Sequence, residues 1–199
     1  MLSSEKNLKN MNFTKNQGTA LNLPNALSLF RLFAIPVVLV CLSFQGRLGS
    51  FLAALFFSIA FITDFLDGYL ARKHGTVTAL GKFLDPLADK ILVCLTLIML
   101  ISLGRAPAWI VVIIVAREIA VTGLRSAAVA EGIVIQASSL GKYKTFSQAM
   151  ATIALCLHYP YLGIDFHLVG VVLLGLALLL TVLSGWAYFR AFYGVFFPK

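Results

Sequence analysis

The chain has 199 residues, of which 60% are hydrophobic and 12% charged, and its formal net charge is +8. Soluble domains carry about a quarter charged residues, so this composition excludes an ordinary soluble domain and predicts an all-α integral membrane protein. At about 20 apolar residues per span, there is room for roughly six transmembrane helices. The positive charge predicts contact with anionic lipid headgroups rather than with nucleic acid.

The N-terminal part divides into a tail and a first helix. Residues 1–22 are polar and contain lysines, so we expect a flexible cytosolic tail. Residues 23–199 are predicted to form a single six-helix transmembrane domain. In its first helix, Asn25, Ser28 and Arg31 recur every three residues and place a polar stripe on the cytosolic end. A helix cap plus an arginine that reaches the interface would explain this stripe equally well.

Four aspartates lie at the facing ends of the next two predicted helices, about 50–73 and about 80–103. They form what we call the acidic quartet, namely Asp64, Asp67, Asp85 and Asp89. Spacings of three and four residues put each pair on one helix face. The quartet is half of the eight acidic residues in the chain. Four like charges held close together repel one another unless a cation lies between them or some are protonated.

The quartet therefore predicts a metal site at a membrane surface. Carboxylates without nearby cysteine favour a hard cation such as Mg²⁺ or Mn²⁺. Four of them suffice for two ions about 4 Å apart, an arrangement that suits phosphoryl oxygens. Gly68, Ala71 and Gly81 clear the helix faces beside the quartet, so a bulky ligand could approach closely. Arg72 adds a cation that suits phosphate.

The fourth predicted helix, about 108–131, carries ionisable residues inside an otherwise apolar segment. Arg117 and Arg125 are eight residues apart, which places them on one face about 12 Å apart. Ionisable groups within a span are costly and favour a functional interpretation. A structural pair, either Arg117 with Glu118 or an arginine with an aspartate, is the alternative.

The fifth helix opens with Lys142 and Lys144, which could also serve simply as cytosolic anchors. The sixth is predicted over about 168–189, and aromatic residues near its end predict an interfacial belt: Tyr188, Phe189, Phe192 and Tyr193. With six spans, nearly all Lys and Arg fall on the side of the two termini, which the positive-inside rule makes cytosolic. The polar clusters of the chain then converge on one face of the membrane.

The quartet and its neighbours match a known pattern. The stretch Asp64-x2-Asp67-Gly68-x2-Ala71-Arg72-x8-Gly81-x3-Asp85-x3-Asp89 resembles the signature of the CDP-alcohol phosphatidyltransferases. The segments PNALSLFRL, GKFLDPLADK, AREIAVTGLR and LGKYKT resemble its bacterial phosphatidylglycerophosphate synthase branch, with Ser28 where that branch often has threonine.

The resemblance implies the CDP-alcohol phosphotransferase fold, with residues 23–199 as one catalytic domain. It implies transfer of a phosphatidyl group from CDP-diacylglycerol to sn-glycerol 3-phosphate, giving phosphatidylglycerol phosphate and CMP, in phosphatidylglycerol and cardiolipin synthesis. The quartet would hold two Mg²⁺ or Mn²⁺ ions, with Asp89 as the general base for the glycerol hydroxyl. A cytidine diphosphate site would be lined by Asn25, Ser28, Asp67, Gly68, Ala71, Arg72 and Gly81. The resemblance further implies a homodimer among the phospholipids of the cytoplasmic membrane, with the active site facing the cytosol.

The phosphate of the acceptor takes no part in the reaction and needs cations of its own. The cations left over by the metal site are the candidates for binding it: Arg31, Arg117, Arg125, Lys142 and Lys144. Binding through this remote phosphate would position the hydroxyl for attack.

Three alternatives stay open. The same family could use another alcohol, such as serine, choline or inositol phosphate, although a neutral or zwitterionic acceptor would not need several cations. A divalent-cation transporter would carry polar groups through both leaflets, whereas these acids gather at one end. A non-catalytic lipid-binding protein would leave the acidic quartet without a purpose.

Overall fold

The computed structural model describes residues 23–44, 46–74, 79–130 and 139–196, with side chains over 29–44, 46–63, 88, 90–129, 140–190, 192 and 193. The predicted tail, 1–22, lies outside the described residues. Six helices and one short hairpin make up the described part: α2 (Leu23–Ser43), α3 (Arg47–His74), α4 (Ala79–Ser102), α5 (Ala108–Ala130), α6 (Ser139–Leu157), β1 (Pro160–Tyr161), β2 (Ile164–Asp165) and α7 (Phe166–Phe196).

The helix ends follow local backbone chemistry. Gly104, with φ of 69°, terminates α4. Its N–H donates to the carbonyl oxygen of Ile101, and the N–H of Arg105 donates to that of Leu100, both at 2.9 Å. This pair of bonds is a Schellman cap, which requires the left-handed conformation that glycine adopts freely. After the turn between α2 and α3, α3 begins at Arg47, a few residues earlier than the sequence predicts.

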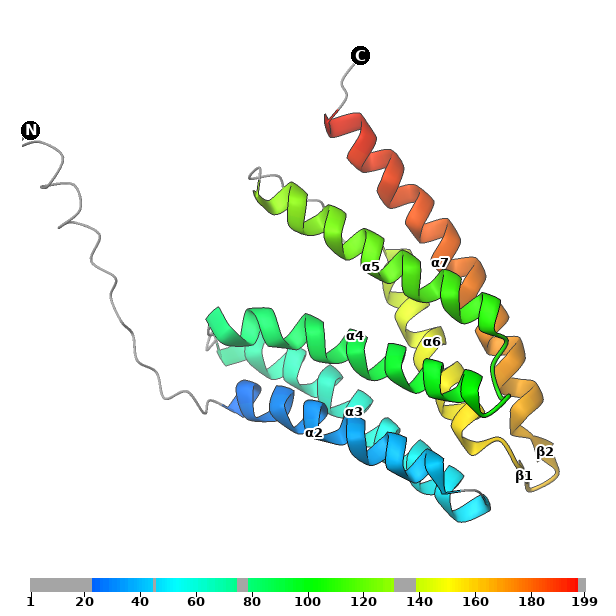
Figure 1. Ribbon diagram of the computed structural model, residues 1–199. Coiled ribbons are helices and arrows are strands. Elements are labelled where there is room, and N and C mark those ends of the chain that lie inside the picture. The colour runs from blue at the N-terminus through cyan, green and yellow to red at the C-terminus, as the bar shows by residue number, and fades with distance from the viewer. Residues whose placement is uncertain (1–22, 45, 75–78, 131–138, 197–199) are drawn as a thin grey trace, which may run out of the picture.

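The helices form two groups joined by α6. Helices α2, α3 and α4 lie together, and α5 lies along α7 (Figure 1). Helix α6 packs along α7 and also contacts α3, so it connects the two groups. The ends of α3, α5 and α7 and the starts of α2, α4 and α6 face the upper left of Figure 1, and we call this the site end. The β1–β2 hairpin lies at the opposite end.

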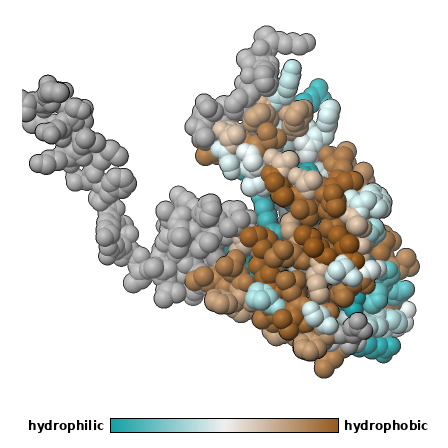
Figure 2. Space-filling view, in the orientation of Figure 1, coloured by the Kyte–Doolittle hydropathy of each residue, from teal (hydrophilic) through white to brown (hydrophobic). Residues whose placement is uncertain are grey.

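Small side chains bring the helices together. Ala53, Ala54 and Ala60 on α3 are buried, as are Ala149 and Ala151 on α6. Large apolar side chains instead cover much of the outer surface, and Figure 2 shows them gathered over the middle of the visible face. Small residues between helices with large apolar residues outside are typical of packing in lipid, where close backbone approach replaces the hydrophobic driving force.

By length and composition, one helix among the described residues can cross a membrane, over Phe166–Arg190 of α7. Shorter apolar stretches occur at Leu29–Ser43, Arg47–Thr63 and Lys90–Ser102. The predicted all-helical architecture is thus confirmed, apart from the two-residue strands, while the count of six spans stays a prediction. The charged residues inside α5 shorten its apolar run, so length and composition alone do not identify α5 as a membrane-spanning helix.

The hairpin end is held by arginine and aromatic side chains. The guanidinium carbons of Arg47 and Arg105 lie 6.0 and 5.9 Å from the ring centre of Tyr159. Arg105 also donates from Nη1 to the carbonyl oxygen of Cys156, at 3.0 Å, near the end of α6. At the start of α7, Asp165 Oδ1 accepts hydrogen bonds from the N–H groups of His167 and Leu168, at 3.0 and 3.2 Å. Asp165 is therefore the N-cap of α7.

Candidate active site

The fold brings the two halves of the acidic quartet to the same end of the molecule. Asp64 and Asp67 lie near the end of α3, and Asp85 and Asp89 lie near the start of α4. These helices are consecutive and adjoin in the bundle (Figure 1). The four side chains lie outside the described part, so their convergence on a metal stays a prediction.

The residues predicted to line the cytidine diphosphate site are spread over three helices that meet at the site end. Asn25 and Ser28 belong to the start of α2, Gly68, Ala71 and Arg72 to the end of α3, and Gly81 to the start of α4. Their side chains also lie outside the described part. The backbone nevertheless places this set beside the acidic quartet, as a shared site requires.

The donor chemistry of the quartet suits a hard divalent cation. All four ligands offered are carboxylates, which Mg²⁺ and Mn²⁺ prefer. Within the described side chains, which do not include the quartet, no group of three or more His, Cys, Asp or Glu could hold a metal ion. A metal site at the end of α3 and the first half of α4 stays a prediction from the sequence.

The five candidate phosphate-binding cations fall into separate groups. Arg31 is only 1% exposed and lies on α2, which packs against α3 and α4 rather than with the other four. Arg117 and Lys144 come together between α5 and α6. Arg125 is exposed on α5, and Lys142 is exposed at the start of α6.

Arg117 and Lys144 meet at Glu118. The ammonium of Lys144, which is 4% exposed, forms an ion pair with Glu118 Oε1. Arg117 Nη1 lies 3.3 Å from the same oxygen, and its Nη2 donates to Ser184 Oγ of α7 at 2.9 Å. The structural Arg117–Glu118 pair considered above is therefore present, and Lys144 and Ser184 extend it across three helices.

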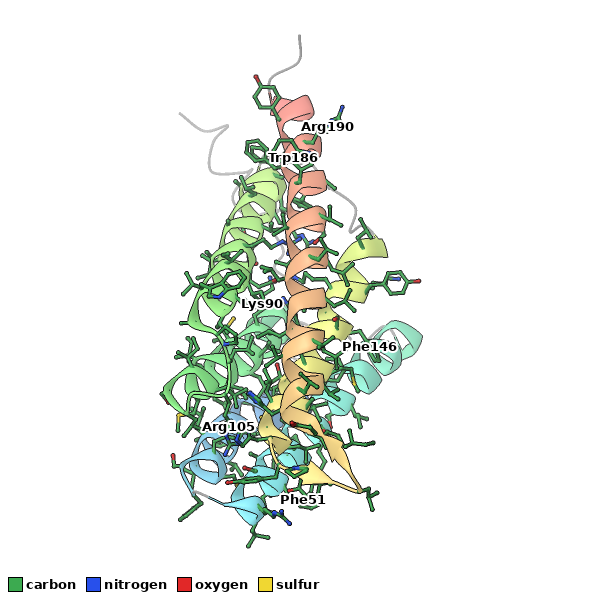
Figure 3. The ribbon with its side chains drawn as sticks, turned by 90° about the vertical axis from the view of Figure 1, so that its right-hand side faces the viewer. Phe51, Lys90, Arg105, Phe146, Trp186 and Arg190 are labelled. Atoms are coloured by element: carbon green, nitrogen blue, oxygen red, sulfur yellow. The ribbon has the colours of Figure 1, made fainter. Side chains whose placement is uncertain are left out.

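A third cation reaches this cluster from α4. The ammonium of Lys90 donates to Thr122 Oγ1, which donates to the carbonyl oxygen of Glu118 at 2.7 Å. Lys90 directly follows Asp89, so this contact ties the quartet-bearing helix to α5. Figure 3 shows Lys90 in the middle of the bundle, between the two ends marked by Arg105 and Arg190.

A small cavity of about 50 Å³ opens between these helices. Its polar lining comes from Lys90, Glu118, Thr145 and Gln148, and its apolar lining from Val93, Cys94 and Ile114. The volume exceeds that of one water, and the lining offers several hydrogen-bonding partners. The cavity can hold a small polar group between α4 and α6.

Sequence reasoning missed Lys90, Thr122 and Ser184. A lysine directly after a quartet aspartate was a visible signal, whereas the hydroxyls of Thr122 and Ser184 had none in helices this apolar. It also misplaced Tyr188 in the aromatic belt. Tyr188 is 7% exposed, because it faces Arg125 on α5 rather than the membrane surface.

A family model described as CDP-alcohol phosphatidyltransferase matches residues 21–183 of this chain. The chain belongs to the CDP-alcohol phosphatidyltransferase family. It is accordingly a transferase of a family of membrane enzymes, as its signature motif predicts.

Individual relatives within the CDP-alcohol phosphatidyltransferase family cover most of the chain. One from Bacillus subtilis (strain 168), named CDP-diacylglycerol–glycerol-3-phosphate 3-phosphatidyltransferase, is 44% identical over 84% of this chain and 93% of its own length. A protein of the same name from Rickettsia bellii is 42% identical over 85% and 94%. A probable phosphatidylglycerophosphate synthase of Mycobacterium tuberculosis H37Rv is 45% identical over 82% and 78%.

Proposed function

We propose that this transferase moves the phosphatidyl group of CDP-diacylglycerol to sn-glycerol 3-phosphate, giving phosphatidylglycerol phosphate and CMP. The names of relatives in three bacterial groups support this acceptor. The observation that carries the proposal is the arrangement of charge. Helices α3 and α4 carry the signature aspartates in their sequence. Helices α5 and α6 add a buried cationic cluster beside α4, which a phosphorylated acceptor needs and a neutral one does not.

In the proposed reaction, a hydroxyl oxygen of glycerol 3-phosphate attacks the lipid-linked phosphorus of CDP-diacylglycerol. A new phosphorus–oxygen bond forms, the diphosphate bond to CMP breaks, and CMP leaves with the bonding electron pair. Asp89, in the first half of α4, would accept the proton of the attacking hydroxyl. A positioned carboxylate base of this kind contributes about a hundredfold or more to such a step.

Asp64, Asp67, Asp85 and Asp89 would hold one or two Mg²⁺ or Mn²⁺ ions. When bound, these ions would supply positive charge to the diphosphate and to the leaving CMP. Residues Asn25, Ser28, Gly68, Ala71, Arg72 and Gly81 would bind the cytidine diphosphate, with the small ones leaving room for it against α3 and α4.

The acceptor phosphate would be bound by Arg117 and Lys144, assisted by Arg125 and Lys142 at the site end. Arg117 retains a donor for this purpose, because its Nε is buried without a hydrogen-bond partner among the described residues. Arg31, on α2, would act from the α3–α4 side of the bundle rather than from α5 and α6.

We further propose a multi-pass protein of the cytoplasmic membrane, with the site end facing the cytosol. At the site end lie Arg125, Lys142 and Arg190, whereas Arg47 and Arg105 lie at the hairpin end. The excess of Lys and Arg at the site end in the whole sequence supports this orientation. A homodimer among membrane phospholipids remains a prediction that rests on the family resemblance.

The direct test is a panel of acceptors with purified protein and CDP-diacylglycerol. Glycerol 3-phosphate, serine, inositol phosphate and choline would each be supplied with Mg²⁺, and again with EDTA. We expect CMP release and labelled lipid product with glycerol 3-phosphate only, and loss of both with EDTA. Preferred transfer to another alcohol would replace the proposed acceptor. Full activity in EDTA would show that the reaction does not require a divalent metal ion.

A further inference from the structure

The geometry points to Glu118 as a positioning residue for the acceptor. Glu118 would touch no substrate, but would fix Arg117 and Lys144 where they bind the acceptor phosphate. This inference rests on the proposed function, because it concerns the same acceptor.

Glu118 is the centre of the contacts between four helices. Its carboxylate pairs with Lys144 of α6 and with Arg117 of α5. Its backbone carbonyl accepts from Thr122, which in turn accepts from Lys90 of α4. Arg117 extends the cluster to Ser184 of α7. The carboxylate of Glu118 therefore sets the relative positions of two cations from α5 and α6, and its backbone carbonyl links Lys90 of α4 to them through Thr122.

Among the described side chains, the charges in this cluster do not balance. Glu118 and Asp165 are the only acidic side chains among those the structure describes, and Asp165 lies at the hairpin end. One carboxylate thus holds two cations, Arg117 and Lys144, by direct contact. A cluster that served stability alone would be best with matched charges, since burying surplus charge is costly. The surplus positive charge suits an anion that arrives with the substrate.

Helix α7 shapes the same site. Ser184 fixes one end of the Arg117 guanidinium, and the next residue is Gly185. A Cβ at Gly185 would lie 3.2 Å from both Cγ and Nε of Arg117. The absence of a side chain there leaves the arginine its space. The Nε that faces this gap is the donor without a partner among the described residues.

The test compares substrate constants across variants of the full chain. Glu118→Gln keeps the shape of the side chain but removes the negative charge that fixes both Arg117 and Lys144. We expect KM for glycerol 3-phosphate to rise about tenfold or more, because charge-assisted hydrogen bonds are lost, while KM for CDP-diacylglycerol changes by less than about twofold. Ser184→Ala should raise the same KM by a smaller factor. Thr181→Val is the matched control: it removes the hydrogen bond from Gln148 of α6 to α7 but keeps the Thr181 backbone carbonyl that accepts from Ser184.

A second variant separates positioning from stability. Glu118→Gln leaves Lys144 buried without its partner, so it lowers the melting temperature, and adding Lys144→Met should restore that temperature without restoring KM. Equal changes in both KM values, or full recovery of KM in the double variant, would overturn the inference. If Glu118→Gln alone does not fold, the inference is tested with Ser184→Ala and with the double variant, again by comparing KM for glycerol 3-phosphate with KM for CDP-diacylglycerol.

A binding measurement needs no turnover. Glycerol 3-phosphate should raise the melting temperature of the unmodified protein and of Thr181→Val, but not that of Glu118→Gln or the double variant. Equal stabilisation of all four proteins would contradict the role of Glu118. Failure of the proposed function would appear differently, as an unmodified protein that does not transfer to glycerol 3-phosphate.

Discussion

Tyr188 of α7 lies beneath Arg125 of α5, with the guanidinium carbon 5.6 Å from the centre of the ring. The ring is buried while the arginine is exposed, so the aromatic face supports a cation at the site end. The Tyr188 hydroxyl has no hydrogen-bond partner among the described residues. The contribution of Tyr188 to Arg125 is therefore that of its ring.

This relationship predicts different results for two substitutions at Tyr188. Tyr188→Leu removes the ring, and we expect KM for glycerol 3-phosphate to rise about two- to fivefold, the range of an exposed cation–π contact. Tyr188→Phe keeps the ring and should retain the original KM. Steady-state kinetics with the acceptor varied would measure both. A similar loss in Phe and Leu variants would assign the effect to the hydroxyl instead.

The packing of α7 on α6 gives a prediction about stability. A Cβ at Gly170 would lie 2.7 Å from Leu155 Cγ and 2.9 Å from the Leu155 backbone nitrogen. Because backbone cannot move aside as a flexible side chain can, Gly170→Ala should destabilise the protein by about 1–3 kcal/mol. The measurement is thermal unfolding of the purified protein in detergent.

Gly175 in the same helix is the matched control for that substitution. A Cβ there would meet no atom within 4 Å. Gly175→Ala should leave the protein equally stable or stabilise it by about 0.5–1 kcal/mol, since alanine restricts the unfolded chain. Equal melting temperatures for the two alanine variants would show that α6 and α7 can separate at Leu155 without cost.

The helices themselves could be predicted from the sequence because apolar runs and turn residues define them. All six predicted helices exist, and the end of α4 at Gly104 follows from glycine in a turn. The partners inside the bundle could not be predicted this way. Which of Ser184, Glu118 or an aspartate would meet Arg117 depends on how α5, α6 and α7 rotate about their axes, and apolar helices carry little periodic signal for that rotation.

The candidate site also has a part that could be predicted from the sequence and a part that could not. The acidic quartet was predicted from spacing, since two helix ends joined by a short loop must adjoin, and the structure tests only the contact between the helices α3 and α4 that carry it. Placing the cations required coordinates: Lys144 looked like a surface anchor but is buried against Glu118, and Arg31, predicted at the cytosolic end of the first helix, is buried. Long side chains reach in several directions, so position along a helix does not fix their partners.

The proposed role of Asp89 predicts loss of activity without loss of fold. Asp89→Asn removes the base and one metal ligand while keeping the size of the side chain, so we expect transfer of labelled glycerol 3-phosphate to fall about a hundredfold or more. The control is Asp165→Asn at the hairpin end, where asparagine can still cap α7. That variant should keep both its activity and its melting temperature. Near-normal turnover by Asp89→Asn would end the role of Asp89 as base.

His158 predicts how stability depends on pH. Burial first, and then the charges of Arg105 and His167, lower the pKa of His158 below its ordinary 6.5, while Asp165 opposes the shift. The folded protein therefore binds fewer protons at His158 than the unfolded chain does, and the stability contributed above pH 6.5 is lost as pH falls through the lower, folded pKa. In His158→Asn, which suits the local φ of 57°, this contribution is absent. Between about pH 8 and about pH 5, the melting temperature should fall further for the unmodified protein than for the variant, and parallel curves would show that His158 does not set the response.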